Sequence, residues 1–210
     1  RKLEDWRAPA KTEQDKKDFR LIPYLRRTVQ RYLGSTSTVF YPCSGFDVAT
    51  PIYATDASRY IFVDLADWSG DILNGLKKLG TRSLSRIDYP ATELMTRYEV
   101  TLPLGKRYEF FFEHNEKRKE VVFHNLWIED YPFNEKFDVY FEKRAMHSTE
   151  DPIFQLRVLE NLIKGGLYIT DTPSFLSTPQ HTLLDLTEQL GTFSLESYGY
   201  GNPHIYLKIE

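Results

Sequence analysis

The sequence predicts an α/β fold in which helices cover both faces of a mostly parallel sheet. Short apolar segments such as 38–41 and 59–65 alternate with stretches whose apolar residues recur every three or four positions, and this alternation is typical of βαβ units. Glycine and proline stand between the segments, where turns are expected. A Tyr-, Phe- and Val-rich stretch before the third parallel strand has the pattern of an antiparallel meander.

Length and composition favour one globular domain with an appendage. The chain has 210 residues, of which 41% are hydrophobic and 27% charged, which excludes disordered, collagen-like and disulfide-scaffold chains. No apolar run approaches the roughly 20 residues needed to cross a bilayer, so we expect a soluble protein without a membrane partner.

Residues 1–35 are expected to form an N-terminal helical extension. Apolar spacing predicts a helix over about 22–33, with one or two further turns before Pro23, ending at Gly34. Residues 1–33 carry 10 Lys or Arg against 5 Asp or Glu, a net +5 in a chain whose total charge is -3. The basic face of this helix is either a solvated surface or a lip for an anionic substrate.

Residues 36–210 are expected to form the α/β domain. Its first half has strands at 38–41 and 59–65, helical segments near 51–54 and over 68–79, and an inserted meander at about 97–119. The predicted meander strands are 97–102, 106–114 and 120–124. The second half has a strand at 137–141, a helix over 152–163, a strand at 167–171, a helix over 180–190, and a closing pair of strands at 192–197 and 204–209.

Several chemistries are disfavoured by missing motifs. The chain has no GxxxxGK[ST], GxSxG or HExxH motif, and its five histidines are too scattered to form a ligand set. We therefore expect no metal site. The net charge does not support a nucleic-acid partner. Cys43 is the only cysteine, which favours a reducing compartment, and a cytoplasmic location is expected.

The order of elements predicts a ligand crevice. Ligands of open α/β sheets bind beyond the carboxyl ends of the strands, where strand order switches. This edge would gather the turn 41–47, Asp64, the pair His124 and Asn125, and the segment 142–144. A carboxylate at the end of the second strand suits a ribose diol. Alternatively, Asp64 stabilises the start of the following helix.

Four segments resemble the class I S-adenosylmethionine-dependent methyltransferases, over about residues 36–210. They are VFYPCSGFD (39–47) followed by YIFVD (60–64), the loop at 130–133 leading to FDV (137–139), and LENLIKGGLYI (159–169). The resemblance implies a Rossmann-like sheet with a reversed last strand and S-adenosylmethionine as cofactor.

The resemblance also implies cofactor-binding residues. The family's first turn reads acidic-x-Gly-x-Gly-x-Gly, and the matching residues here are Tyr41, Cys43, Gly45 and Asp47, with Ser44 inside the turn. Only the middle glycine is kept, and a Cβ at the other positions narrows the turn. Asp47 either faces the cofactor's amino group or caps the next helix. Asp64 would hold the ribose, and His124 or Asn125 would lie near the adenine.

Catalysis is harder to assign from the sequence. Methyl transfer needs in-line geometry and sometimes a base, for which Glu142 is the candidate. It begins a Glu-Lys-Arg run that is either an acceptor-binding cluster or a surface salt link. Amino methylation of the Asn-Pro-Pro-Tyr type is not supported.

Three function hypotheses remain open. The first is a methyltransferase-like protein of unknown acceptor. The second is a catalytically inactive module of the same fold, which contacts a protein partner through the meander or the N-terminal arm. The third, a dinucleotide-dependent oxidoreductase, lacks the expected GxGxxG turn.

Overall fold

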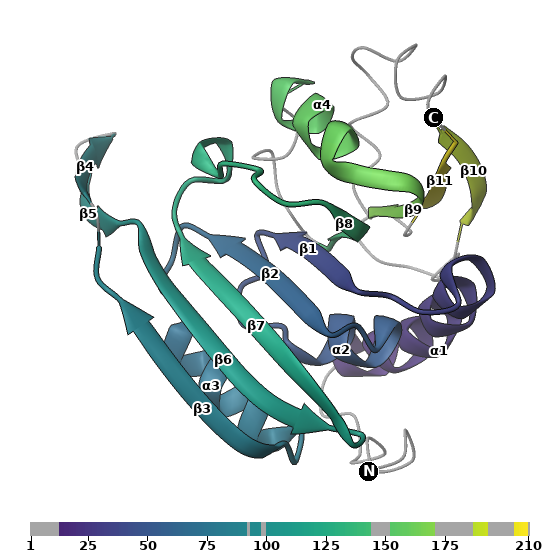
Figure 1. Ribbon diagram of the computed structural model, residues 1–210, viewed down its shortest axis with the longest axis horizontal. Helices are drawn as coiled ribbons and strands as arrows, with labels where there is room; N and C mark the ends of the chain where they lie inside the picture. Colours follow the sequence, from purple (N-terminus) through teal and green to yellow (C-terminus); the bar gives the residue numbers. More distant parts are fainter. Residues whose placement is uncertain are drawn as a thin grey trace.

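Five parallel strands form the centre of the sheet. The computed structural model describes residues 13–91, 93–97, 100–143, 152–170, 187–192 and 204–209. The central strands are β1 (Thr38–Pro42), β2 (Arg59–Asp64), β7 (Lys117–Asn125), β8 (Phe137–Glu142) and β9 (Leu162–Thr170). They lie in the order β9-β8-β1-β2-β7 (Figure 1). The segments of β1 and β2 are apolar on both faces because helices or loops cover both sides of a parallel sheet.

An antiparallel extension continues the sheet beyond β7. Strand β6 (Lys106–His114) pairs with β7, and β3 (Arg82–Tyr89) pairs with β6 at the sheet edge. Between them, β4 (Glu93–Arg97) and β5 (Val100–Leu104) form a separate two-stranded sheet. The predicted meander strands 106–114 and 120–124 correspond to β6 and β7. The predicted strand 97–102 is wrong, because it spans the end of β4 and the start of β5, which pair with each other and not with β6. Strand β3 was not predicted.

The other end of the sheet contains the reversed strand. β11 (His204–Lys208) runs antiparallel to β9, and β10 (Thr187–Thr192) runs antiparallel to β11. Residues 187–190 were predicted to be the end of a helix. This prediction was wrong, because these residues belong to strand β10, which pairs with β11. The rest of that predicted helix and the predicted strand residues 193–197 lie outside the described residues.

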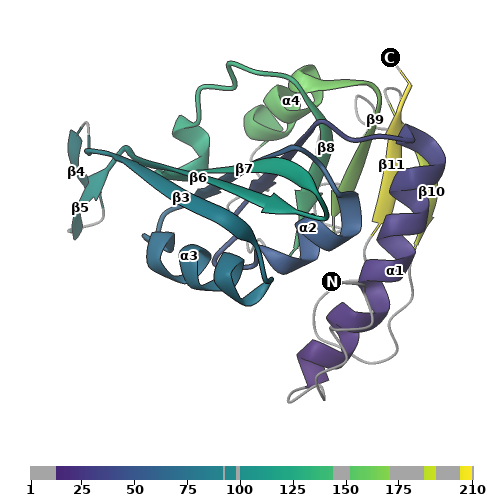
Figure 2. The same cartoon turned by 60° about the horizontal axis from the view of Figure 1, so that its bottom comes forward.

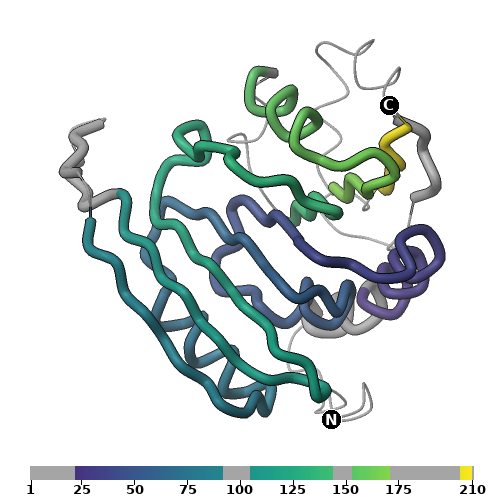
Figure 3. The backbone as a smooth tube through the Cα atoms, in the orientation of Figure 1, coloured from purple at the N-terminus to yellow at the C-terminus, as the bar shows by residue number. Residues whose placement is uncertain are grey.

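Helices cover both faces of the sheet, as predicted. On one face lie α1 (Glu13–Leu33), α2 (Ala49–Thr55) and α3 (Ser69–Lys78), and on the other lies α4 (Pro152–Asn161) (Figure 2). The connection from β7 to β8 contains the short helix η2 (Ile128–Asp130) and runs on the α4 side (Figure 3). The two faces have separate buried apolar clusters, one around Phe62 and Leu76 and one around Phe40 and Phe154.

The described helices include none that is long and apolar enough to span a membrane.

Candidate functional site

The turn after β1 has the backbone shape of a glycine-rich turn. Gly45 has φ +53°, and Cys43 has φ +49° although it carries a side chain. Left-handed φ values are unfavourable for most residues other than glycine, and a hydrogen bond from the Cys43 N–H to Val63 O (2.7 Å) fixes this one. Among described residues, no heavy atom lies within 4 Å of a Cβ built at Gly45. The backbone at Gly45 is therefore open to a ligand.

Asp64 faces this turn from the end of the neighbouring strand β2. Its Oδ2 accepts the Gly45 N–H (2.9 Å), and its Oδ1 accepts the Ala66 N–H (3.0 Å). Each carboxylate oxygen has two acceptor sites, so one site per oxygen remains after these bonds. Asp64 is only half-buried, and this leaves the carboxylate able to accept two hydroxyl donors.

Asp47 ends the turn in a polar network. Its Oδ2 lies 3.1 Å from Lys143 Nζ and accepts a hydrogen bond from the Tyr41 hydroxyl (3.4 Å), while its Oδ1 accepts the Thr50 N–H (3.1 Å). Burial raises the pKa of the Asp47 carboxyl, but the Lys143 ammonium and the Thr50 hydrogen bonds outweigh burial and hold that pKa below its ordinary value. Asp47 therefore stays ionised and ties the turn to the start of α2.

Tyr41 and Ser44 are both buried in the turn. The Tyr41 ring packs edge-on against Phe62 and Phe141, with ring centroids 5.6 and 4.9 Å apart, and only its hydroxyl reaches the Asp47 network. The Ser44 hydroxyl donates to Gly45 O at 3.3 Å. The Ser44 side chain thus hydrogen-bonds to the backbone of the turn.

His124 and Asn125 point to opposite faces of β7. The Asn125 amide donates to Leu65 O (2.7 Å) and joins the end of β7 to the loop after Asp64. The His124 ring instead lies edge-on to Tyr131, 5.3 Å between centroids, on the α4 side. Burial, reinforced by the nearby Arg107 and Arg59, lowers the pKa of His124 to about 4, so His124 is a neutral imidazole at neutral pH.

Glu142 is buried at the end of β8. Its Oε2 accepts hydrogen bonds from the Tyr140 hydroxyl (2.9 Å) and the Thr170 hydroxyl (3.2 Å). Only 2% of the residue is exposed. The next residue, Lys143, points the other way, toward Asp47. Arg144, the third member of the predicted cluster, lies outside the described residues.

An aromatic pair beside the turn was missed. Phe46 is 60% exposed, and its ring lies 5.4 Å from the Trp68 ring at the start of α3. The available signal was position, since Phe46 follows Gly45 and Trp68 follows Asp64 by four residues.

The structure thus brings six of the eight predicted residues together at the carboxyl edge of β1, β2 and β7. They are Tyr41, Ser44, Gly45, Asp47, Asp64 and Asn125. The other two, His124 and Glu142, pack or hydrogen-bond on the α4 side. Within the described ranges, no three His, Cys, Asp or Glu side chains gather as metal ligands would.

Comparison with known proteins gives matches by structure alone. No protein-family profile and no curated protein sequence matches the chain. The N-methyltransferase NodS from Bradyrhizobium japonicum, solved with S-adenosyl-L-homocysteine, superposes with a TM-score of 0.53 at 10% identity, covering 99% of this chain and 98% of NodS. This chain has the class I methyltransferase fold.

Two further solved structures agree with that fold. Magnesium protoporphyrin IX methyltransferase (ChlM) from Synechocystis, solved with bound SAM, has a TM-score of 0.53 at 10% identity over 98% of this chain and 90% of ChlM. A putative methylase from Haemophilus influenzae has a TM-score of 0.53 at 15% identity over 92% of this chain and 99% of its own. The predicted methyltransferase-like fold, with its reversed strand, is confirmed.

Proposed function

We propose that the chain is an S-adenosylmethionine-dependent methyltransferase whose cofactor lies across the Gly45 turn and Asp64. The observation that carries this proposal is the 2.9 Å hydrogen bond that joins the two at the carboxyl ends of the adjacent strands β1 and β2. In open α/β sheets this edge is where ligands bind. The solved structures with bound S-adenosylmethionine or S-adenosylhomocysteine that share the fold support the choice of ligand.

In this proposal Asp64 accepts the two ribose hydroxyls and the open backbone at Gly45 lies under the methionine part. Asn125 would lie near the adenine, and its amide holds the Leu65 carbonyl. His124 is the alternative residue near the adenine, from the opposite face of β7. Asp47, ionised beside Lys143, is the carboxylate within the turn that would face the ammonium group of the cofactor. Tyr41 and Ser44 shape the turn from within.

The cofactor would supply an electrophilic methyl group, and the residues of this chain would orient the acceptor and exclude water. Glu142 is the proposed base. Two hydroxyl groups already hydrogen-bond its carboxylate, so an acceptor proton would have to reach it from the β8 end. The exposed Phe46 ring, paired with Trp68, is placed to cover the bound nucleoside.

A second candidate function is a catalytically inactive module of the same fold. It is favoured by the side chains at Cys43 and Asp47, two positions at which the methyltransferase family has glycine. It is also favoured by the Lys143 ammonium, which lies within the turn. In that case the meander or the N-terminal arm would be the contact surface for a partner. Residues 1–12 of the arm lie outside the described residues.

Melting temperature measured with rising S-adenosylhomocysteine tests the binding. A ligand at about 100 times its Kd stabilises a protein by about 2.7 kcal/mol, which for a domain of this size is an upward shift of about 5–10 °C. We expect this shift in the native chain and in Asp71→Asn, which removes an exposed carboxylate of α3. We expect none in Asp64→Ala.

The unliganded melting temperature of Asp64→Ala separates lost binding from lost folding. No shift in the native chain at millimolar ligand would contradict the proposed site. A shift without methylation of any acceptor class supplied would favour the inactive module.

A further inference from the structure

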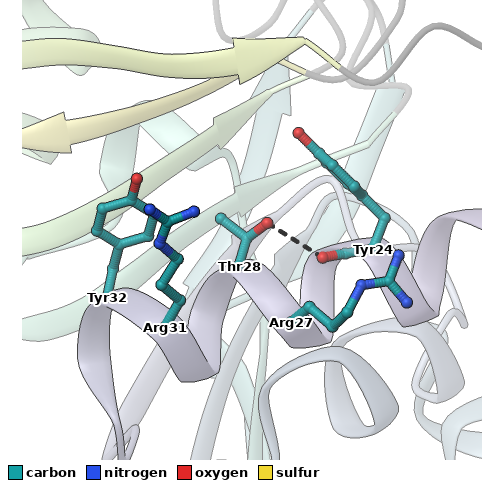
Figure 4. Close-up of a pocket in the computed structure, with 5 residues that line it drawn as sticks. All are labelled: Tyr24, Arg27, Thr28, Arg31 and Tyr32. Carbon is teal, nitrogen blue, oxygen red and sulfur yellow. Dashed lines mark hydrogen bonds between the residues drawn. The ribbon is translucent and has the colours of Figure 1, made fainter.

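The outer face of α1 carries a surface pocket that the proposed function does not use. Its volume is about 380 Å³, and its described lining is Tyr24, Arg27, Thr28, Arg31 and Tyr32 (Figure 4). The opposite face of the same helix packs into the core through Ile22, Leu25 and Val29. The pocket residues are therefore held on a helix that burial fixes in place.

Among the residues that the structure describes, no carboxylate pairs with the positive charge of this pocket. Arg27 and Arg31 are exposed, and neither forms an ion pair with a carboxylate of the described residues. They stand one helical turn apart, where two like charges destabilise a helix by about 0.2–0.5 kcal/mol. Residues 22–33 contain three arginines and no acidic residue. An anion between Arg27 and Arg31 would remove this repulsion.

Tyrosine rings flank the two arginines. Tyr24, Thr28 and Tyr32 follow one another at intervals of four residues, so they form a row beside Arg27 and Arg31 (Figure 4). Tyr32 is 37% exposed, and the Arg31 guanidinium lies 5.4 Å from its ring centroid. Thr28 donates its hydroxyl hydrogen to Tyr24 O at 3.1 Å, so the arginines, and not Thr28, supply the donors of this pocket.

We propose that this pocket binds a nucleotide, with the phosphate on Arg27 and Arg31 and the base against the ring of Tyr32. Guanidinium groups bind phosphate oxygens with paired hydrogen bonds, and aromatic side chains stack on any base. The nucleotide is either free or part of a single-stranded nucleic acid. The pocket shares no residue with the candidate cofactor site, so this proposal does not depend on methyltransferase activity.

The test uses the full chain with three probes: inorganic phosphate, uridine 5′-monophosphate and a fluorescent single-stranded oligouridylate. Calorimetry follows the first two and fluorescence anisotropy the third. Uridine compounds are chosen because they lack the adenine of the proposed cofactor. We expect saturable binding of the monophosphate or the oligomer, weakened about tenfold or more in Arg27→Gln/Arg31→Gln. The same binding should persist in Asp64→Asn, in which the cofactor site is altered.

The matched control is Lys77→Gln/Lys78→Gln, which removes two exposed positive charges from the last turn of α3. It should change affinity by less than about twofold. Tyr32→Ala should weaken uridine 5′-monophosphate but not phosphate. Tighter binding of the oligomer with a steep salt dependence identifies a strand as the source, and equal binding of the monophosphate identifies a free nucleotide.

Three outcomes would overturn the proposal. The first is no saturable binding of either uridine probe to the native chain. The second is an equal loss of affinity in both double variants, which would indicate general charge attraction. The third is an affinity for inorganic phosphate equal to that for uridine 5′-monophosphate, which would show that the base does not contact Tyr32.

Discussion

Asp47 and Lys143 form the pair that most distinguishes this turn from a glycine-rich one. The Lys143 side chain is only 9% exposed, and its ammonium lies 3.1 Å from the Asp47 carboxylate and 3.3 Å from the Thr50 hydroxyl. A half-buried carboxylate without a partner is costly. The lysine therefore compensates for a charged residue at a position where a glycine is expected.

Removal of Lys143 should destabilise the protein. We expect Lys143→Met to lower the free energy of unfolding by about 2 kcal/mol, because it leaves the Asp47 charge without its cation. Adding Asp47→Asn to the Lys143→Met variant should restore part of that loss, so the interaction free energy between the two residues should be about 1 kcal/mol or more. Urea denaturation of the native chain, the two single variants and the double variant measures it.

The matched control is Lys106→Met, which breaks an exposed pair with Asp67 (3.4 Å). Its cost should stay below about 1 kcal/mol. Equal costs for the two lysine variants would show that the Asp47 pair is an ordinary surface contact.

His124 should make stability depend on pH. Burial and the nearby Arg107 and Arg59 depress the pKa of His124 to about 4, so below its ordinary pKa of 6.5 the unfolded chain binds a proton that the folded chain does not. The free energy of unfolding therefore falls as pH drops from about 6.5 toward 4, by up to about 1.4 kcal/mol per pH unit from this group.

The variant His124→Asn should flatten that dependence. We expect its loss of stability between pH 7 and pH 5 to be smaller than that of the native chain by about 1–2 kcal/mol, measured by urea denaturation. Above pH 7.5 the two slopes should agree, because the imidazole is neutral in both states. Identical slopes at low pH would show that His124 is not protected from protonation.

At the scale of elements, α3 packs directly against the end of the turn. A Cβ built at Gly75 would lie 2.8 Å from Val48 Cγ2, a stiff and buried side chain, whereas one built at Gly70 meets no described atom within 4 Å. Gly75→Ala should therefore cost about 1–3 kcal/mol through overpacking. Gly70→Ala should be neutral or stabilise by up to about 1 kcal/mol.

Thermal or urea denaturation of these two glycine variants measures the contrast. If Gly75→Ala were as stable as Gly70→Ala, the contact between α3 and the turn would be looser than described.

The elements also show what the sequence can predict and why. Strands β1 and β2 were predicted because burial on both faces demands an apolar run. Strand β3 was missed because an exposed edge strand carries polar residues such as Arg86 and Asp88 and shows little apolar alternation. At β10, pairing with β11 outweighs the local helical pattern. The contact of Lys143 with Asp47, 96 residues apart, depends on the fold and has no local signal.

At the scale of the whole molecule, strand order places the candidate site. β1 lies between β2 and β8, so the chain adds later strands on both sides of β1. The strand order therefore reverses at β1, and the turn that contains Gly45 lies at its carboxyl end. The sequence predicted that Gly45 and Asp64 would meet there, because both follow adjacent parallel strands. It did not separate His124 from Asn125, although neighbouring residues of a strand point to opposite faces.

The proposed cofactor site depends above all on Asp64, which would accept the ribose hydroxyls of a bound nucleoside. Calorimetric titration of S-adenosylhomocysteine and its 2′-deoxy analogue, into the native chain and Asp64→Asn, tests it most directly. A hydrogen bond to a charged group contributes about 1.5–3 kcal/mol, so the native chain should prefer the parent compound by about tenfold or more, and Asp64→Asn should bind the two compounds nearly equally. Equal affinity of the native chain for both compounds, or no saturable heat with either, would contradict the account.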